Sequence, residues 1–158
     1  MSDEYYMNIA LKEARKSLKN HDVPVGAVIV LNDKIVSKSY NQKEKHKSTC
    51  AHAEILAIKK ANKKLNCNRL DGATIYTTKE PCLMCMGAIL SARIKRIVFG
   101  AGDKRFGTKT LAKENNFNHK CEIDEGVLED ECSLILSEFF KDLRCNRGSS
   151  DQTKYKNK

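Results

Sequence analysis

Four residues in two short segments have the types and the spacing that a catalytic zinc site requires. His52 and Glu54 form an H-x-E motif, and Cys82 and Cys85 form a P-C-x-x-C motif that begins at Pro81. One imidazole and two thiolates are donors that suit zinc, and three protein ligands leave a fourth position open for water. An open position matters because zinc lowers the pKa of a bound water until hydroxide is available near neutral pH.

The spacing within each motif indicates a different role for Glu54 than for the other three residues. Cys82 and Cys85 are three residues apart, so a helix would place both thiols on one face. In the first turn of that helix the positive end of the dipole favours the thiolate form. Glu54 lies two residues after His52, a step of about 200° on a regular helix, so it does not share the direction of the ligand. We therefore expect Glu54 to move protons and His52, Cys82 and Cys85 to hold zinc.

Two other interpretations of these residues remain open from the motifs themselves. A structural zinc site would need a fourth protein ligand, for which Glu54 or Cys50 is available. A C-x-x-C pair alone also occurs in thiol–disulfide proteins, although that chemistry leaves His52 and Glu54 without a role.

The pattern of apolar residues predicts the elements that position these motifs. Helical spacing covers residues 3–18, 51–61, 81–92 and 129–143, and strands are expected at residues 25–31, 34–40, 73–78, 97–99 and 121–127. The first two strands, joined at residues 32–33, form a hairpin, and a polar loop follows at residues 43–49. Alternation of strands and helices after that hairpin predicts an α/β layered domain with a mixed central sheet. We expect residues 1–145 to form one zinc-dependent domain and residues 146–158 a disordered basic tail.

Charge and cysteine content indicate what kind of partner and which cellular compartment to expect. Residues 1–118 carry 22 Lys and Arg against 11 Asp and Glu, whereas residues 119–145 carry 3 against 8. A basic body suits a polyanionic partner, although lysine-rich composition also serves solubility. The seven cysteines are odd in number, and no export signal or apolar span is visible, so we expect cytoplasmic thiols and no membrane association.

The sequence resembles the cytidine deaminase superfamily and, within it, the tRNA-specific adenosine deaminases of bacterial type. The combination of H-x-E with P-C-x-x-C is the signature of zinc nucleobase deaminases. The resemblance extends from about Tyr6 to Leu143 and includes, besides those motifs, the segments Pro24-Val25-Gly26-Ala27-Val28, Asn118-His119 and Gly126-Val127-Leu128. It departs from the family pattern at Cys50, at Lys79 and in the loop 104–109.

That resemblance implies a fold, an activity and further site residues. The fold would be a three-layer arrangement with a mixed five-stranded sheet flanked by helices, and the active form a homodimer. The activity would be hydrolysis of adenosine to inosine at the wobble position of tRNA, with one Zn2+ per chain. By position, Asn41 matches a residue that binds the flipped base, Asp103 one that contacts the anticodon-loop backbone, and Phe139 and Phe140 the aromatic end of a helix near the RNA.

Two other functions compete with this hypothesis. A deaminase acting on free guanine, cytosine or cytidine would use the same zinc chemistry on a small molecule. A non-catalytic RNA-binding subunit could retain the zinc site, but it would have no need of the Glu54 carboxylate.

Overall fold

The computed structural model describes residues 1–114 and 117–150, with side chains up to Arg147. The strands are β1 (Gly26–Leu31), β2 (Lys34–Tyr40), β3 (Thr74–Lys79), β4 (Arg96–Ala101) and β5 (Glu122–Glu125). The helices are α1 (Asp3–Ser17), the 3-10 turn η1 (Leu18–Asn20), α2 (Lys43–His46), α3 (Ala53–Leu65), α4 (Leu83–Ser91), α5 (Lys109–Glu114) and α6 (Glu129–Ser150).

The five strands form one mixed sheet, as expected, and their order is β2-β1-β3-β4-β5. Strand β1 pairs antiparallel with both β2 and β3, whereas β3, β4 and β5 are parallel to one another. Strands β2, β3, β4 and β5 therefore all run in one direction. Their carboxyl ends meet at the same edge of the sheet, which is where ligand sites of open α/β sheets form.

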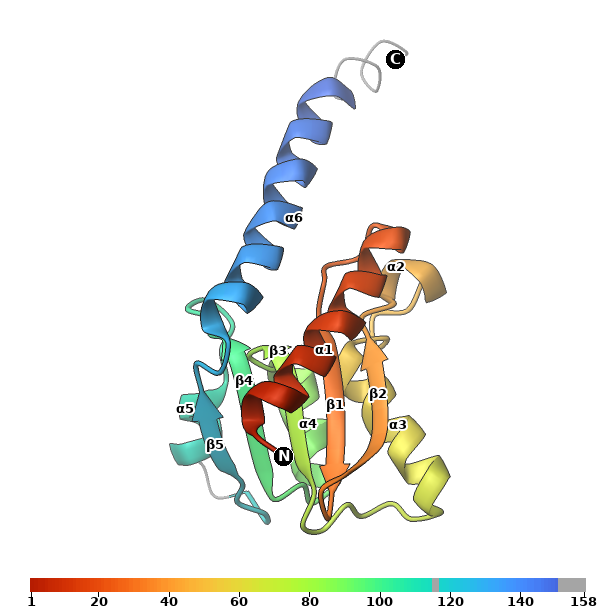
Figure 1. Ribbon diagram of the computed structural model, residues 1–158, viewed down its shortest axis with the longest axis vertical. Helices are drawn as coiled ribbons and strands as arrows, with labels where there is room; N and C mark the ends of the chain where they lie inside the picture. The colour runs from red at the N-terminus through yellow and green to blue at the C-terminus, as the bar shows by residue number, and fades with distance from the viewer. Residues whose placement is uncertain (115–116, 151–158) are drawn as a thin grey trace.

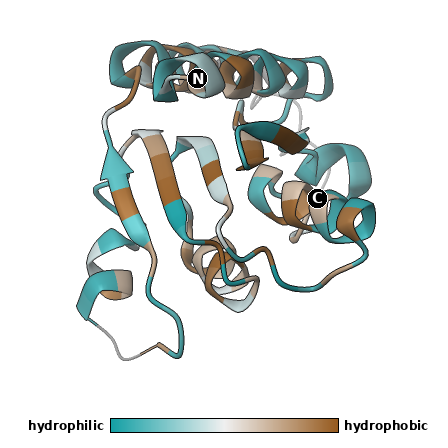
Figure 2. Cartoon of the chain, turned by 60° about the horizontal axis from the view of Figure 1, so that its bottom comes forward, coloured by the Kyte–Doolittle hydropathy of each residue, from teal (hydrophilic) through white to brown (hydrophobic). Residues whose placement is uncertain are grey.

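Helices cover the sheet on two sides and give the molecule three layers. Helix α1 packs on β1, β2 and β3, and α6 packs on β4 and β3, whereas α3 and α4 contact each other behind the sheet (Figure 1). The hydrophobic colour in Figure 2 concentrates on the strands and on the helix faces turned towards them. Among the described residues, no helix has the length and apolar content needed to cross a membrane.

Contact between α1 and the sheet depends on small residues. A Cβ atom on Gly26 would lie 1.9 Å from the carbonyl oxygen of Ala10 and 2.7 Å from the backbone nitrogen of Ala14. Both alanines are fully buried, so the helix rests directly on the first residue of β1. A glycine is required here by the close approach of two backbones.

The structure corrects several predicted boundaries. The polar loop at 43–49 contains the short helix α2, and a second short helix, α5, occupies residues expected to be irregular. Helix α4 begins at Leu83 and not at Pro81, because Cys82 has extended backbone and caps the helix. Helix α3 runs to Leu65 and α6 to Ser150, past the predicted ends at residues 61 and 143. Residues 151–158 of the predicted tail lie outside the described part of the chain.

Candidate metal and active site

The candidate site lies where the carboxyl-terminal edge of the sheet meets the N-termini of two helices. His52 caps α3 and Cys82 caps α4, both with extended backbone angles. Cys85 is in the first turn of α4 and is buried. Because both helices begin at this edge, two segments 30 residues apart in sequence place their side chains together.

His52, Cys82 and Cys85 form a group with the dimensions of a tetrahedral zinc site. The Nδ1 atom of His52 lies 3.6 Å from Sγ of Cys82 and 3.5 Å from Sγ of Cys85. Tetrahedral zinc with its usual bond lengths separates nitrogen and sulfur ligands by about 3.5 Å. All three ligand atoms lie within 4.8 Å of one another. In the part of the chain that the structure describes, this is the one group of His, Cys, Asp or Glu side chains close enough together to hold a metal ion. The residues therefore fit the metal.

The thiols at the site are prepared for binding a cation. Hydrogen bonds with Cys85 and His52 lower the pKa of Cys82 to about 3, so that a thiolate is present at neutral pH. The hydrogen bond with Cys82, together with burial, raises the pKa of Cys85. Both sulfurs lie at the N-terminus of α4, whose dipole favours negative charge, and a coordinated zinc ion deprotonates a thiol outright.

Glu54 lies in the first turn of α3 and is buried beside the three candidate ligands. Burial raises the pKa of Glu54 above its usual value, opposed by its own backbone hydrogen bond, by His52 and by a hydrogen bond with Cys85. A carboxyl group whose pKa is shifted towards neutrality can both accept and return a proton. The arrangement can therefore supply metal, water activation and proton transfer at one place.

Asn41 follows β2 at the same edge, and its side chain is engaged within its own loop. The amide nitrogen donates to the carbonyl oxygen of Val23 at 3.1 Å, and the amide oxygen accepts from the backbone nitrogen of Lys43 at 3.2 Å. These two bonds fix the orientation of the amide at the start of α2. Phe139 of α6 lines the same hollow, of about 520 Å³, as Asn41.

Asp103 follows β4 and uses its carboxylate to shape a loop. Its Oδ1 atom accepts from the backbone nitrogens of Arg105 at 2.9 Å and Phe106 at 3.0 Å, and Oδ2 accepts from Nζ of Lys79 at 2.5 Å. Burial alone would raise the pKa of Asp103, but the bonds from Lys79 and the two backbone groups outweigh it and lower that pKa to about 2. Phe140 packs edge-on against Phe139, with ring centroids 5.3 Å apart, and is exposed.

The predicted site residues therefore lie in three places along the carboxyl-terminal edge of the sheet. His52, Glu54, Cys82 and Cys85 gather at the helix N-termini, Asn41 and Phe139 line a hollow, and Asp103 stands in the β4–α5 loop.

Comparison with known proteins places the chain in a family. Residues 1–101 match the family model described as the cytidine and deoxycytidylate deaminase zinc-binding region. The tRNA-specific adenosine deaminase of Bacillus subtilis is 46% identical over 90% of this chain and 91% of its own length. That of Aquifex aeolicus is 43% identical over 92% and 99%. The chain belongs to the cytidine and deoxycytidylate deaminase family, in the branch of tRNA-specific adenosine deaminases.

Solved structures of deaminases share the fold. A structure from a study of A-to-I editing by tRNA:A34 deaminases superimposes with a TM-score of 0.81 and 37% identity, covering 84% of this chain and 99% of the other. A guanine deaminase from Bacillus subtilis superimposes with a TM-score of 0.63 and 31% identity, covering 77% and 83%. Membership of this deaminase family, together with the His and Cys geometry, identifies zinc as the cofactor, one ion per chain.

One side chain in this deaminase site was missed by the sequence analysis. Glu80, between β3 and Pro81, is buried, and its carboxylate accepts two backbone hydrogen bonds from the loop that follows β4. The available signal was its position, a carboxylate next to a ligand motif and directly after a buried strand. Its partners lie more than 20 residues away, so the spacing of the motif did not indicate them.

Proposed function

We propose that this chain hydrolyses adenosine to inosine at the wobble position of tRNA, with release of ammonia. The observation that carries the proposal is the buried Glu54 carboxylate beside the His52, Cys82 and Cys85 group. A purely structural zinc site has no use for a buried carboxyl group that does not bind the metal. The similarity to proteins named tRNA-specific adenosine deaminase supports adenosine in tRNA as the substrate.

His52, Cys82 and Cys85 hold the zinc ion, which when bound supplies a Lewis acid that makes water nucleophilic near neutral pH. Glu54 accepts the proton that water releases as its oxygen attacks C6 of the adenine ring. The protonated carboxyl group then donates this proton to the ring nitrogen beside C6. The regenerated carboxylate takes the second proton, from the new hydroxyl group on C6, and passes it to the amino group, so that the C–N bond breaks, ammonia leaves and C6 becomes the carbonyl carbon of inosine. Burial suits Glu54 to this cycle, because the raised pKa makes its protonated form accessible.

Asn41, Asp103, Phe139 and Phe140 are the proposed RNA-binding residues. Asn41 and Phe139 line one hollow together with Lys43, Lys45 and Lys47, which combines an aromatic ring, an amide and positive charge. Single-stranded RNA is recognised through stacked bases and phosphate contacts, so this lining suits an anticodon loop. Asp103, the proposed contact to the RNA backbone, also fixes the conformation of its own loop, because its carboxylate is bonded to Lys79 and to backbone nitrogens.

The active form is proposed to be a homodimer that works in the cytoplasm. Leu83, in the first turn of α4, is 63% exposed directly beside the zinc ligands, and Met84 is exposed next to it. Large exposed apolar residues beside a site are typical of an interface. All seven cysteines are free, which suits a reducing compartment. Sedimentation equilibrium of the purified protein would show a species of twice the 17.9 kDa chain mass, and a monomer at all concentrations would refute the homodimer.

The substrate is tested by incubating the purified zinc protein with unmodified tRNA, adenosine, cytidine and guanine, followed by mass spectrometry of every product. Inosine at the wobble position, formed far faster than any deaminated nucleoside or base, is the expected result. The matched control is Glu54→Gln, which should leave each substrate unchanged. A second candidate, guanine deamination, is favoured by the 31% identical guanine deaminase structure. Release of ammonia from guanine with tRNA unmodified would establish that alternative and refute the proposal.

A further inference from the structure

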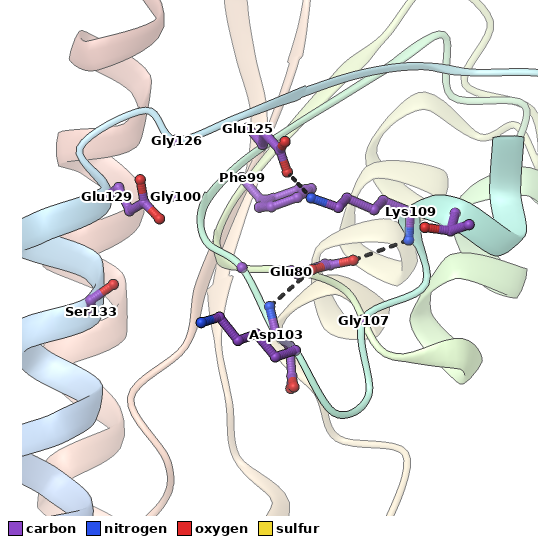
Figure 3. A pocket seen from close by; sticks show the side chains of 13 residues that line it. Glu80, Phe99, Gly100, Asp103, Gly107, Lys109, Glu125, Gly126, Glu129 and Ser133 are labelled. Atoms are coloured by element: carbon purple, nitrogen blue, oxygen red, sulfur yellow. Dashed lines mark hydrogen bonds and ion pairs between the residues drawn. The ribbon is translucent and has the colours of Figure 1, made fainter.

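Glu80 joins the segment that carries the zinc ligands to a loop on another strand. It lies between Lys79, the last residue of β3, and Pro81, and its own backbone nitrogen donates to the carbonyl oxygen of Ala101 at 2.8 Å. Its side chain is 4% exposed. Oε2 accepts from the backbone nitrogen of Asp103 at 2.9 Å, and Oε1 accepts from that of Lys109 at 3.0 Å (Figure 3).

Asp103 and Lys109 are the two ends of the loop 103–109, so one carboxylate closes it. The backbone nitrogen of Gly107 donates to the carbonyl oxygen of Asp103 at 3.0 Å. A Cβ atom on Gly107 would lie 2.5 Å from Oε1 of Glu80 and 2.3 Å from that carbonyl oxygen. The loop therefore wraps the Glu80 carboxylate so closely that only glycine fits at position 107.

The residues on either side of Glu80 hold the same loop. Nζ of Lys79 donates to Asp103, and the hydroxyl group of Thr108, a buried residue, donates to the carbonyl oxygen of Pro81 at 2.9 Å. Three consecutive residues that end beside the ligand Cys82 thus each bond the loop 103–109. Any shift of the loop relative to the metal site would have to break these bonds together.

These bonds hold the base of the loop and leave its tip, residues 104–106, exposed to solvent. Lys104, Arg105 and Phe106 are exposed, and Phe106 is 73% exposed. Cationic side chains and an aromatic ring are the groups that contact phosphates and stack on bases in single-stranded RNA. Because the base of the loop is already ordered, less conformational freedom is lost when the tip binds.

We propose that Glu80 is a positioning residue, which sets the distance between the RNA-binding tip at residues 104–106 and the zinc ligands. The proposal rests on the RNA substrate proposed above. Glu80 acts through the two backbone hydrogen bonds and does not touch the reacting base. Its effect is on alignment, and a displacement of about 1 Å is enough to lower a rate by about a hundredfold.

Glu80→Gln tests the proposal, since glutamine keeps the shape but turns an amide N–H group towards one of the two backbone N–H donors. We expect wild-type zinc content and a kcat/KM for an anticodon stem–loop lowered by about 10- to 100-fold, mostly through kcat, because the RNA still binds but its base is misplaced relative to the zinc ligands. Hydrogen exchange of the Asp103 and Lys109 amides should accelerate by about tenfold or more, with the amides of β1 and β3 unchanged. This second readout does not depend on activity.

Two further variants keep the test decisive. Glu125→Gln removes the ion pair between Glu125 and Nζ of Lys109, 2.5 Å apart, but leaves the Lys109 backbone bond intact, so it should match wild type. Thr108→Val removes the bond to Pro81 without a change of charge and should lower kcat in the same direction as Glu80→Gln.

Wild-type kinetics and amide exchange in Glu80→Gln would overturn the proposal, as would zinc loss in that variant combined with an unaltered Thr108→Val enzyme. Failure of the wild-type protein to form inosine in RNA would instead refute the proposed function. The two failures are therefore distinguishable.

Discussion

His52 and Glu54 serve different purposes because they have different backbone conformations. His52 precedes α3 with extended angles, φ −73° and ψ 151°, and so directs its ring towards Cys82 and Cys85. Glu54 is inside the first turn and buried. A two-residue spacing on a continuous helix would point the side chains to nearly opposite sides. Placing the helix start between them allows both to reach one ion and its water.

Replacing either cysteine ligand should remove the metal. Cys82→Ser and Cys85→Ser each leave two protein ligands, so zinc content should fall from one ion per chain to near zero. Stability should fall too, because metal binding is coupled to folding. Cys145→Ser, at an exposed cysteine of α6, is the control and should retain full zinc. Atomic absorption together with thermal unfolding measures both effects, and a zinc-replete Cys82→Ser protein would exclude Cys82 as a ligand.

Glu54→Gln should separate proton transfer from metal binding. The amide keeps the size of the side chain but cannot accept or return a proton, so kcat should fall by a factor of at least about 10². Zinc content and melting temperature should stay near those of wild type. Single-turnover assays with an anticodon stem–loop measure the loss. A variant that lost its zinc would show that Glu54 is a ligand and that the site is structural.

Among the elements, those with strong local patterns were predictable and those held by distant residues were not. The hairpin was predicted from its apolar runs, and Asn32 and Asp33 have φ values of 51° and 58°, as a tight turn requires. Helix α2 was not predicted, because the residue that holds its first turn is distant in sequence. The backbone nitrogens of Glu44 and Lys45 donate to the carboxylate of Asp22, more than 20 residues earlier.

The site, too, has parts that could be predicted from the sequence and parts that could not. The zinc ligands were predictable because Cys82 and Cys85 form one short motif and His52 lies with Glu54 in another, whereas the role of Glu80 depends on which loop folds over it. Helix α5 begins at Lys109, the residue whose nitrogen bonds Glu80, so its start is also fixed by a residue that sequence spacing does not reveal. The roles of Asn41, Asp103, Phe139 and Phe140 in RNA binding stay predictions.

The first turn of α1 is fixed to the sheet by a charged network. Asp3 accepts two hydrogen bonds from Arg96, at 2.9 and 2.8 Å, and one from the hydroxyl group of Tyr76 at 2.8 Å. Arg96 and Tyr76 belong to β4 and β3, so three elements meet at this carboxylate. Burial and the bond to Asp3 raise the pKa of Tyr76 well above 10.

Tyr76 should make the fold sensitive to alkali. A group whose pKa is higher in the folded protein than in the unfolded chain stabilises the fold fully below the unfolded value, here about 10. That contribution is lost as the pH rises from about 10 towards the folded pKa. Tyr76→Phe should cost about 1 kcal/mol at pH 8 through the missing hydrogen bond and should show a shallower loss of stability above pH 10. Urea unfolding at pH 8 and pH 11 measures the difference, and parallel losses in the two proteins would contradict it.

At the scale of the whole molecule, positive charge and the site lie in the same part of the chain. Residues 1–118 hold the excess of Lys and Arg, and they include every proposed zinc ligand. The acidic excess of residues 119–145 belongs partly to the first turn of α6, at Glu129, Asp130 and Glu131. Helix α6 extends beyond the end of the sheet (Figure 1) and carries Phe139 to the hollow lined by Lys43, Lys45 and Lys47. The lysines of this hollow would attract an anionic partner to the place where Asn41 and Phe139 lie.

Affinity for RNA should fall with salt, and the loop tip should account for part of that dependence. Each phosphate neutralised on a single strand contributes about −0.7 to the slope of log affinity against log salt. Replacing Lys104 and Arg105 together by alanine should therefore make the slope less negative by about 1.4 if each contacts one phosphate. The matched control replaces Lys63 and Lys64, at the opposite end of α3 from His52, with the same change of net charge. Fluorescence anisotropy of a labelled anticodon stem–loop measures the affinity of both variants. A salt series from roughly 50 to 300 mM is wide enough to resolve the slope. If the two double variants changed the slope equally, charge would act over the whole molecule and the loop tip would not contact phosphate; a change confined to Lys104 and Arg105 places RNA at the tip that Glu80 positions.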